Sequence, residues 1–384
     1  MIVQKYGGSS VATIEKIKAI AENIKKTVHE KVIIVVSAMG KTTNNLLEQA
    51  KQICETPNKR EVDALISTGE QQSASLMAMA LCDIGVKAIS LNAMQAKIHT
   101  TSNFGKALIK KIDTKHLTKL FEKFDAIVIT GFQGVCRGKN ITTLGRGGSD
   151  TTAVALASAM NAMCEIFTDV EAIYSVNPSL HKDAKKLKVL NYNLALEMAS
   201  SGAKVLDERA IEIAKKFGTE IYLGKTLEND HSKGTYVMNK NFLEEVRVNS
   251  ISIRENVFHV SLQANLISQV IKALKQQNQN LEMLAINSQS ISFVCKKEHQ
   301  KSVEKALKKI QKQPLKTSSN LTRITLVGYG FMTHTEIVEK LYEMMSEESI
   351  RFDNLYLTET TISFLIPTRE KHKTIKSLVE LYEL

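Results

Sequence analysis

Residues 3–11 read Val-Gln-Lys-Tyr-Gly-Gly-Ser-Ser-Val, a strand-like segment that leads through Lys5 into a pair of glycines. A helical pattern begins near Ser10 or Thr13. Glycines let a backbone approach a phosphate closely, and the N-terminus of a following helix presents unpaired N–H groups. Lys5 adds a full positive charge at the end of the strand. On spacing alone, the stretch predicts either a phosphate-binding loop or an ordinary strand–turn–helix.

The residues beyond this loop alternate between buried strands and helices. Residues 32–36 (Val-Ile-Ile-Val-Val), 126–129 and 221–223 are short apolar runs typical of strands that are buried on both faces. Between the first two runs, residues 46–54 repeat apolar side chains at helical spacing. The alternation predicts an α/β fold in which helices sandwich a mostly parallel sheet, with ligands at the carboxyl ends of its strands.

The C-terminal part contains an internal repeat. Ile291-Ser292-Phe293-Val294 and Ile362-Ser363-Phe364-Leu365 are near copies, 71 residues apart, and helical segments near 266–274 and 337–344 follow the same offset. Each copy reads strand, helix, strand, strand, helix and a final strand, which is a ferredoxin-like βαββαβ unit. These patterns predict three domains, at residues 1–240, 241–318 and 319–384.

Four further stretches carry residues suited to binding anions and amino acids. Residues 144–152 read Leu-Gly-Arg-Gly-Gly-Ser-Asp-Thr-Thr, in which an arginine able to grip a carboxylate bidentately precedes two glycines and a helix. Residues 37–44 place small hydroxyl side chains after a buried strand, Glu70 opens a helix, and residues 167–174 end a strand. Each of these is also compatible with ordinary helix capping.

Taken together, the Lys5 loop and the stretch at 144–152 closely resemble the signature of the aspartokinases, members of the amino-acid kinase superfamily. The C-terminal repeat resembles a tandem pair of ACT domains, which are regulatory modules of amino-acid biosynthesis. The resemblance implies ATP-dependent phosphorylation of the side-chain carboxylate of L-aspartate to 4-phospho-L-aspartate. That reaction is the first step toward lysine, through diaminopimelate, and toward threonine and methionine.

The resemblance also implies roles for individual residues. Lys5 would be catalytic, and Asp150 would help to organise it. Nine residues would bind ATP: Lys5, Gly7, Gly8, Ser9, Ser37, Ser149, Thr168, Asp169 and Tyr174. Six residues would bind aspartate: Thr43, Glu70, Arg146, Gly147, Gly148 and Ser149. The phosphates of ATP would hold the Mg²⁺ ion, with no dedicated set of protein ligands.

The sequence departs from the aspartokinase pattern both in its catalytic part and in its C-terminal repeats. Asn177-Pro178-Ser179 stands where the family usually has Asp-Pro-Arg, so a phosphate-contacting arginine is missing. The nearby lysines 182, 185 and 233 are alternative replacements. The first repeat also lacks an Asp-x-Pro-Gly turn that meets the effector amino acid. We therefore expect weak or absent inhibition by lysine and threonine. The competing hypothesis is a sensor rebuilt from three asparagines: Asn265, Asn280 and Asn287.

Composition excludes several other classes. The formal charge of +11 invites a nucleic-acid reading, but the lysines lie mostly on helical faces and aromatic residues make up only 5%. Five scattered cysteines favour neither a disulfide framework nor a zinc site, and neither a signal peptide nor a membrane span is expected. We expect a cytoplasmic homodimer, or a higher even oligomer, joined through the ACT-like units.

Two other functions compete with the aspartokinase reading. An acetylglutamate kinase would share the fold, but an acetylated nitrogen offers Glu70 no charge to pair with. An inactive amino-acid sensor would require a broken catalytic set, whereas Lys5, Glu70, Arg146 and Asp150 are all present.

Two common nucleotide-binding motifs do not apply to this sequence. A P-loop motif is absent, and Gly328-Tyr329-Gly330 fits a turn in the second repeat better than a dinucleotide fingerprint.

Overall fold

The computed structural model describes residues 1–27, 29–203, 206–239, 247–276, 282–310 and 316–384. The chain forms two compact units, each of which is described by itself. The first unit contains Met1–Ile173, Lys186–Ala199 and Val205–Asn241. The second contains Tyr174–Lys185, Ser200–Lys204 and Phe242–Leu384.

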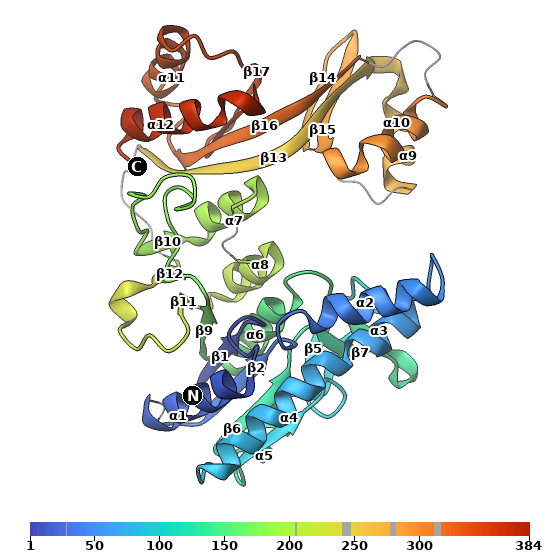
Figure 1. Cartoon of the computed structure of the whole chain (residues 1–384), viewed down its shortest axis with the longest axis vertical. Helices are drawn as coiled ribbons and strands as arrows, with labels where there is room; N and C mark the ends of the chain where they lie inside the picture. The colour runs from blue at the N-terminus through green and yellow to red at the C-terminus, as the bar shows by residue number, and fades with distance from the viewer. Residues whose placement is uncertain (28, 204–205, 240–246, 277–281, 311–315) are drawn as a thin grey trace. The chain divides into compact units, whose positions relative to one another are not determined.

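The first unit is built on an eight-stranded sheet of order β10-β12-β11-β9-β1-β2-β6-β3 (Figure 1). All neighbouring strands are parallel except β11 and β12. Every residue of β2 and β6 is buried, as their continuous β-branched runs predict. The strands are β1 (Ile2–Tyr6), β2 (Val32–Val36), β3 (Ala88–Leu91), β6 (Ala126–Thr130), β9 (Met163–Thr168), β10 (Val189–Asn191), β11 (Ile221–Lys225) and β12 (Thr235–Met238).

Helices cover both faces of this sheet. α1 (Ile14–Thr27) and α4 (Thr68–Asp83) pack together over the face that carries Ile34 and Val36. α1 suits this place because its apolar residues recur at helical spacing, with Glu15 in its first turn and lysines in its last. α6 (Gly148–Met160) packs against β1, β2 and β9, and α8 (Glu208–Phe217) packs along α6. The predicted mostly parallel α/β architecture is confirmed.

A small second sheet of order β5-β4-β7-β8 lies in the same unit. Its strands are β4 (Ile98–Thr100), β5 (Ile109–Ile112), β7 (Gln133–Val135) and β8 (Ile141–Thr143). β8 leads directly into the loop before α6, so this sheet determines where that loop begins. The other helices are α2 (Thr42–Ile53), α3 (Lys59–Ile66), α5 (Thr114–Leu120) and α7 (Tyr192–Ser201).

The second unit contains one antiparallel sheet of order β14-β15-β13-β16-β18-β17. Its strands are β13 (Arg247–Gln263), β14 (Glu282–Ile286), β15 (Ser290–Lys296), β16 (Lys316–Tyr329), β17 (Asp353–Leu357) and β18 (Thr361–Pro367). Its helices are α9 (Ile267–Gln276), α10 (Gln300–Leu307), α11 (Glu336–Glu347) and α12 (Lys371–Tyr382). The repeated strand–helix–strand–strand–helix order agrees with the predicted pair of ACT-like units.

The two ACT-like units share their longest strand. Val248 and Ile251, in the first half of β13, belong to the hydrophobic core that contains α11 and α12. Phe258 and Val260, in its second half, belong to the core that contains α9 and α10. Each unit therefore depends on a strand that also serves the other, so they are joined more closely than two consecutive domains.

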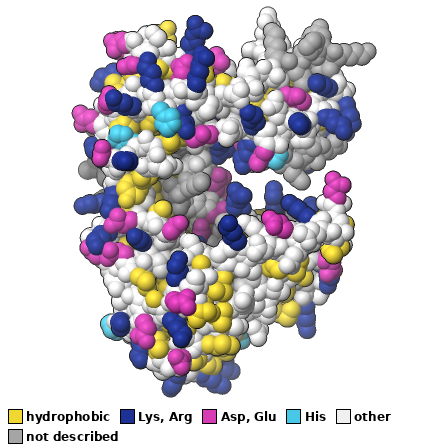
Figure 2. All heavy atoms as spheres, in the orientation of Figure 1, with side chains coloured by type: hydrophobic (Ala, Val, Ile, Leu, Met, Phe, Trp, Pro, Cys, Tyr) yellow, Lys and Arg dark blue, Asp and Glu magenta, His cyan; other side chains and the backbone are white. Residues whose placement is uncertain are grey.

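On the face shown in Figure 2, Lys and Arg side chains are interspersed with Asp and Glu and do not gather into one stripe. A nucleic-acid-binding face would concentrate the positive charge. Across the described ranges, no helix combines the length and apolar character that a membrane span requires.

Candidate active site

The Lys5 loop connects β1 to α1 at the carboxyl edge of the large sheet. Lys5 lies one residue before the end of β1, and its side chain is only 11% exposed. Gly8 passes so close to the next loop that an added Cβ would lie 2.8 Å from the Ala38 carbonyl oxygen. Only glycine fits there, which brings the two loops that follow β1 and β2 together.

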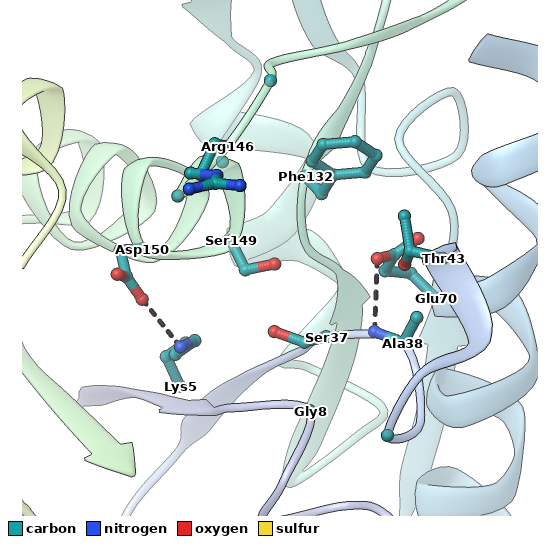
Figure 3. Close-up of a pocket in the computed structure, with 14 residues that line it drawn as sticks. Lys5, Gly8, Ser37, Ala38, Thr43, Glu70, Phe132, Arg146, Ser149 and Asp150 are labelled. Atoms are coloured by element: carbon teal, nitrogen blue, oxygen red, sulfur yellow. Dashed lines mark hydrogen bonds and ion pairs between the residues drawn. The ribbon is translucent and has the colours of Figure 1, made fainter. Parts of the chain in front are cut away.

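The second half of the site is the loop between β8 and α6. Gly147 has φ = 72°, a left-handed conformation that favours glycine, and it caps α6. The turn places the N-terminus of α6 at the cavity, with Gly148, Ser149 and Asp150 in its wall, and Figure 3 shows the side chain of Ser149 there. A helix N-terminus of this kind favours anions.

Lys5 and Asp150 form an ion pair that joins the two loops. Lys5 Nζ lies 2.7 Å from Asp150 Oδ1, and the Asp150 side chain is 18% exposed. Because Lys5 projects from the strand and Asp150 from the first turn of α6, the pair fixes the ammonium at the cavity wall (Figure 3).

Glu70 is a buried carboxylate with a free oxygen. It lies in the first turn of α4, is 3% exposed, and accepts a hydrogen bond from the Ala38 N–H at 3.2 Å through Oε1. Its Oε2 is buried and has no hydrogen-bond partner among the described residues. Burial raises the pKa of Glu70 to about 7. An unsatisfied buried acceptor is costly unless a ligand completes it, so this oxygen marks a position for a cationic group.

Arg146 is the complementary group. Its side chain is exposed, and no acidic partner within ion-pair distance is found in the part of the chain that the structure describes. Arg146 and Glu70 line the same cavity of about 240 Å³. Figure 3 shows Glu70 with Thr43 on one side of this cavity and Arg146 with Asp150 on the other. The remaining lining residues are Lys5, Gly8, Ser37, Ala38, Gly40, Phe132, Gly145, Gly147, Gly148 and Ser149.

A second cavity, of about 260 Å³, lies beyond the same glycine loop. Ser9 and Ser10 line it, whereas Gly8 lines the first cavity. The Ser10 and Thr226 hydroxyls lie 2.6 Å apart, and Thr226 Oγ1 donates a hydrogen bond to the Thr168 carbonyl at 3.0 Å. The other lining residues are Lys16, Ile20, Asp169, Lys225 and Leu227. Two cavities on either side of one phosphate-type loop suit two substrates, one of which carries phosphates.

Known proteins resemble this chain over its whole length. The sequence profile described as "Amino acid kinase family" matches residues 1–225. An aspartokinase of Geobacillus stearothermophilus is 35% identical over 398 residues, which cover 100% of this chain and 97% of that protein. The chain belongs to the aspartokinase family.

Two solved structures of one aspartokinase also share its fold. The crystal structure of E. coli aspartokinase III in complex with aspartate and ADP (R-state) has a TM-score of 0.82 at 20% identity and covers 100% of both chains. The structure of the same enzyme in complex with lysine and aspartate (T-state) has a TM-score of 0.77 at 20% identity, covering 100% of this chain and 99% of that one. At this identity the likeness establishes the fold.

The aspartokinase residues predicted from the sequence fall into three groups. The first cavity contains Lys5, Gly8, Ser37, Thr43, Glu70, Arg146, Gly147, Gly148, Ser149 and Asp150. The second contains Ser9, Thr168 and Asp169. Gly7 lines neither cavity, and its N–H donates a hydrogen bond to the Phe167 carbonyl at 3.2 Å. Tyr174 belongs to the second unit and lines neither cavity.

The predicted effector residues differ in their surroundings. Asn287 Oδ1 accepts the backbone N–H groups of Gln289 and Ser290, so this oxygen stabilises the β14–β15 turn. Asn265 is exposed in a short 3₁₀ turn before α9. Asn280 lies outside the described residues.

Sequence reasoning missed several residues of both cavities. Phe132 and Ala38 line the first cavity, and Lys225 and Thr226 line the second. Phe132 has φ = 69°, which is rare for a non-glycine residue. The position of Lys225 at the carboxyl end of a predicted buried strand was an available signal. In an α/β sheet, that edge is where ligands bind.

Proposed function

We propose that the chain transfers the γ-phosphoryl group of MgATP to the side-chain carboxylate of L-aspartate, giving 4-phospho-L-aspartate and ADP. The observation that carries this proposal is that Glu70 and Arg146 line one cavity, where neither Glu70 Oε2 nor the Arg146 guanidinium has a partner among the described residues. A free α-amino acid presents one ammonium and one carboxylate, which these two groups complement. The bound aspartate and ADP named for the related aspartokinase III support the same pair of substrates.

The orientation follows from the charges. The α-ammonium would bind Glu70 Oε2, and the α-carboxylate would bind the guanidinium of Arg146 in a bidentate pair. The side-chain carboxylate is then left to face Lys5, between the glycine loop and Ser149. An acetylated nitrogen would leave Glu70 unpaired, which disfavours an acetylamino acid as the substrate.

The chemistry needs positioning and charge neutralisation more than proton transfer. A side-chain carboxylate with a pKa near 4 is already ionised at neutral pH, so no general base is required. The barrier is the approach of one anion to another, which Lys5 and the positive end of the α6 dipole would lower. Asp150 keeps the Lys5 ammonium in place through the 2.7 Å ion pair.

The second cavity is our proposed nucleotide site. Thr168, Asp169, Lys225 and Thr226 would contact the nucleoside and its phosphates. We propose that Lys225 replaces the arginine missing at position 179, because it lines this cavity and makes no ion pair with a described residue. Lys233, a replacement considered from the sequence, pairs instead with Glu228 at 2.7 Å.

Magnesium fits this site as an ion carried by the nucleotide. Mg²⁺ prefers oxygen ligands and keeps phosphates and water around it. Within the described ranges, no three acidic, histidine or cysteine side chains converge on one point. We assign the Glu70 carboxylate to the substrate ammonium and Asp150 to Lys5. When bound, the ion would neutralise negative charge on the transferred phosphoryl group.

The pathway, regulation and assembly are further parts of the proposal. We propose that the reaction opens the route to lysine, threonine and methionine, with residues 1–240 catalytic and 241–318 and 319–384 regulatory. The T-state complex named for aspartokinase III makes lysine the first effector to test. We propose a cytoplasmic homodimer joined through the ACT-like units, which light scattering at micromolar concentration tests directly.

A substrate panel tests the assignment. ADP release is followed with MgATP and, in turn, L-aspartate, D-aspartate, L-glutamate, N-acetyl-L-glutamate and carbamate. We expect rapid turnover only with L-aspartate. Equal or faster turnover with acetylglutamate or carbamate would reject the proposed function in favour of another amino-acid kinase activity.

A further inference from the structure

Residues at the start of α8 contact the loop that carries Arg146 and fix its backbone. Arg146 is exposed and has no ion-pair partner in the described chain, so its own side chain does not fix its position. Its backbone must therefore be fixed by its neighbours. α8 packs along α6 in the first unit (Figure 1). Asp207 and Arg209, at the start of α8, make contacts at both ends of this loop.

Arg209 fixes the N-terminal end of the loop. Its guanidinium donates one hydrogen bond to the Leu144 carbonyl at 2.6 Å and a second to the Ala107 carbonyl at 3.0 Å. Leu144 is two residues before Arg146 and is itself 1% exposed. A bidentate contact with two carbonyls requires the planar fork of arginine, which a lysine lacks.

Asp207 fixes the C-terminal end. Its Oδ1 accepts a hydrogen bond from the Thr151 hydroxyl at 2.9 Å, and its carboxylate lies directly against Gly147. A Cβ added to Gly147 would lie 2.2 Å from Asp207 Oδ2, so the carboxylate occupies the space that a side chain at position 147 would need. Thr151 follows Asp150, the partner of Lys5, within the first turn of α6.

Neither residue lines the substrate cavity. Asp207 and Arg209 instead contact the residues that form the cavity wall. Asp63 makes similar contacts beside the loop that carries Arg146. Asp63 is 1% exposed and accepts hydrogen bonds from the Gly105 and Thr143 N–H groups and from the Thr143 hydroxyl. Asp63 holds the strand that leads into the loop, whereas α8 holds the residues that carry the binding groups.

We propose that Asp207 and Arg209, together the α8 clamp, are positioning residues that set the geometry of Arg146 for the carboxylate of the amino-acid substrate. They act through Leu144, Gly147 and Thr151 and touch neither substrate. The inference rests on the proposed function, because it assigns Arg146 to the carboxylate of aspartate.

Four variants of the full-length chain test the clamp. Asp207→Ala removes the acceptor for Thr151, whereas Asp207→Asn keeps an acceptor oxygen of the same size. Arg209→Met removes both carbonyl contacts with a side chain of similar length. Thr151→Val removes the donor with little change of shape. Asp113→Ala is the matched control, since Asp113 caps α5 through the His116 N–H at 3.1 Å, away from both cavities.

We expect Asp207→Ala and Arg209→Met to raise the KM for aspartate about tenfold or more, because a displaced Arg146 would lose its charged hydrogen bond with the carboxylate. The KM for MgATP should stay within about twofold. Asp207→Asn should restore most of the affinity, and adding Thr151→Val to Asp207→Ala should have little further effect. Asp113→Ala should lower the Tm without changing either KM.

The results separate the clamp from the proposed function. A wild-type chain that does not turn over aspartate would reject the proposed function before any variant is compared. An active wild type whose Asp207→Ala and Arg209→Met variants melt earlier but keep the wild-type KM for aspartate would reject the clamp alone, as would equal rises in both KM values.

Discussion

Replacing Glu70 with glutamine is the sharpest perturbation of the proposed aspartate site. Glutamine keeps the length and volume of the side chain and can still accept the Ala38 N–H through its oxygen. It removes the negative charge at the position of Oε2 and places an amide donor there. The substrate ammonium would then meet another donor, so the change removes one charged contact and little else.

The expected rise in the KM for aspartate follows from the loss of the contact between Glu70 and the substrate ammonium. A hydrogen bond to a charged group is worth about 1.5–3 kcal/mol, so the KM for aspartate should rise roughly tenfold to 150-fold in Glu70→Gln. The pH dependence adds a second measure. With a pKa of about 7 in the empty site, Glu70 must lose its proton before the ammonium binds. The KM of the wild type should therefore rise about tenfold from pH 8 to pH 6, and the variant should lose this dependence.

Glu70→Gln should weaken the binding of aspartate without weakening the fold. Burial raises the pKa of Glu70 above its unfolded value, so the ionised carboxylate destabilises the empty fold once the pH exceeds about 7. Its favourable contribution is complete below an unfolded pKa near 4.5 and is lost as the pH rises through 7. At pH 8, Glu70→Gln should therefore be as stable as the wild type or more stable, by up to about 3 kcal/mol.

The assay combines initial rates at saturating MgATP, calorimetric binding of aspartate and thermal melting, each from pH 6 to pH 8. Glu165→Gln is the control, because Glu165 is also a buried carboxylate with a raised pKa but lies outside both cavities. The control should keep the wild-type KM. A Glu70→Gln variant whose KM stays within twofold of the wild type, with the pH dependence intact, would refute the assignment of Glu70 to the ammonium.

Four other outcomes are expected. Lys5→Ala should lower kcat at least a hundredfold in steady-state assays with little change in KM, because its charge acts mainly in the transition state; a near-normal kcat would contradict this. Arg146→Lys should raise the KM for aspartate tenfold or more, and wild-type affinity would rule out bidentate recognition. Lys225→Met should raise the KM for MgATP severalfold, whereas Lys26→Met, an exposed control in the last turn of α1, should not. Lysine and threonine, titrated singly and together against initial rate, should inhibit weakly, and half-inhibition below about 1 mM (roughly 4 kcal/mol of binding) would favour a rebuilt sensor.

Local sequence was sufficient to predict the strands that are buried on both faces. The β-branched run at 32–36 and the apolar run at 126–129 appear as β2 and β6 because such runs suit a central parallel strand. The glycine-rich stretches around Lys5 and Arg146 also marked their own cavity, since each needs a backbone conformation or a close approach that few other residues allow.

Contacts between segments that are distant in the sequence could not be predicted from local sequence patterns. β13 serves two cores because β16 pairs along most of its length, and the 71-residue repeat gives no sign of that sharing. Lys225 reaches the second cavity, and Asp207 reaches Gly147, only because the sheet order places β11 beside β9 and α8 beside α6. Such pairings depend on the whole topology, so spacing within a single stretch could not reveal them.

The position of the transferred phosphoryl group tests the central claim most directly. The chain is incubated with MgATP, L-aspartate and hydroxylamine, which converts an acyl phosphate into a stable hydroxamate, and the product is identified by mass spectrometry and NMR. The proposed geometry holds the α-carboxylate at Arg146 and leaves the side-chain carboxylate free, so the product should be aspartate β-hydroxamate. The α-hydroxamate, or no aspartate hydroxamate while ATP is consumed, would contradict the proposal.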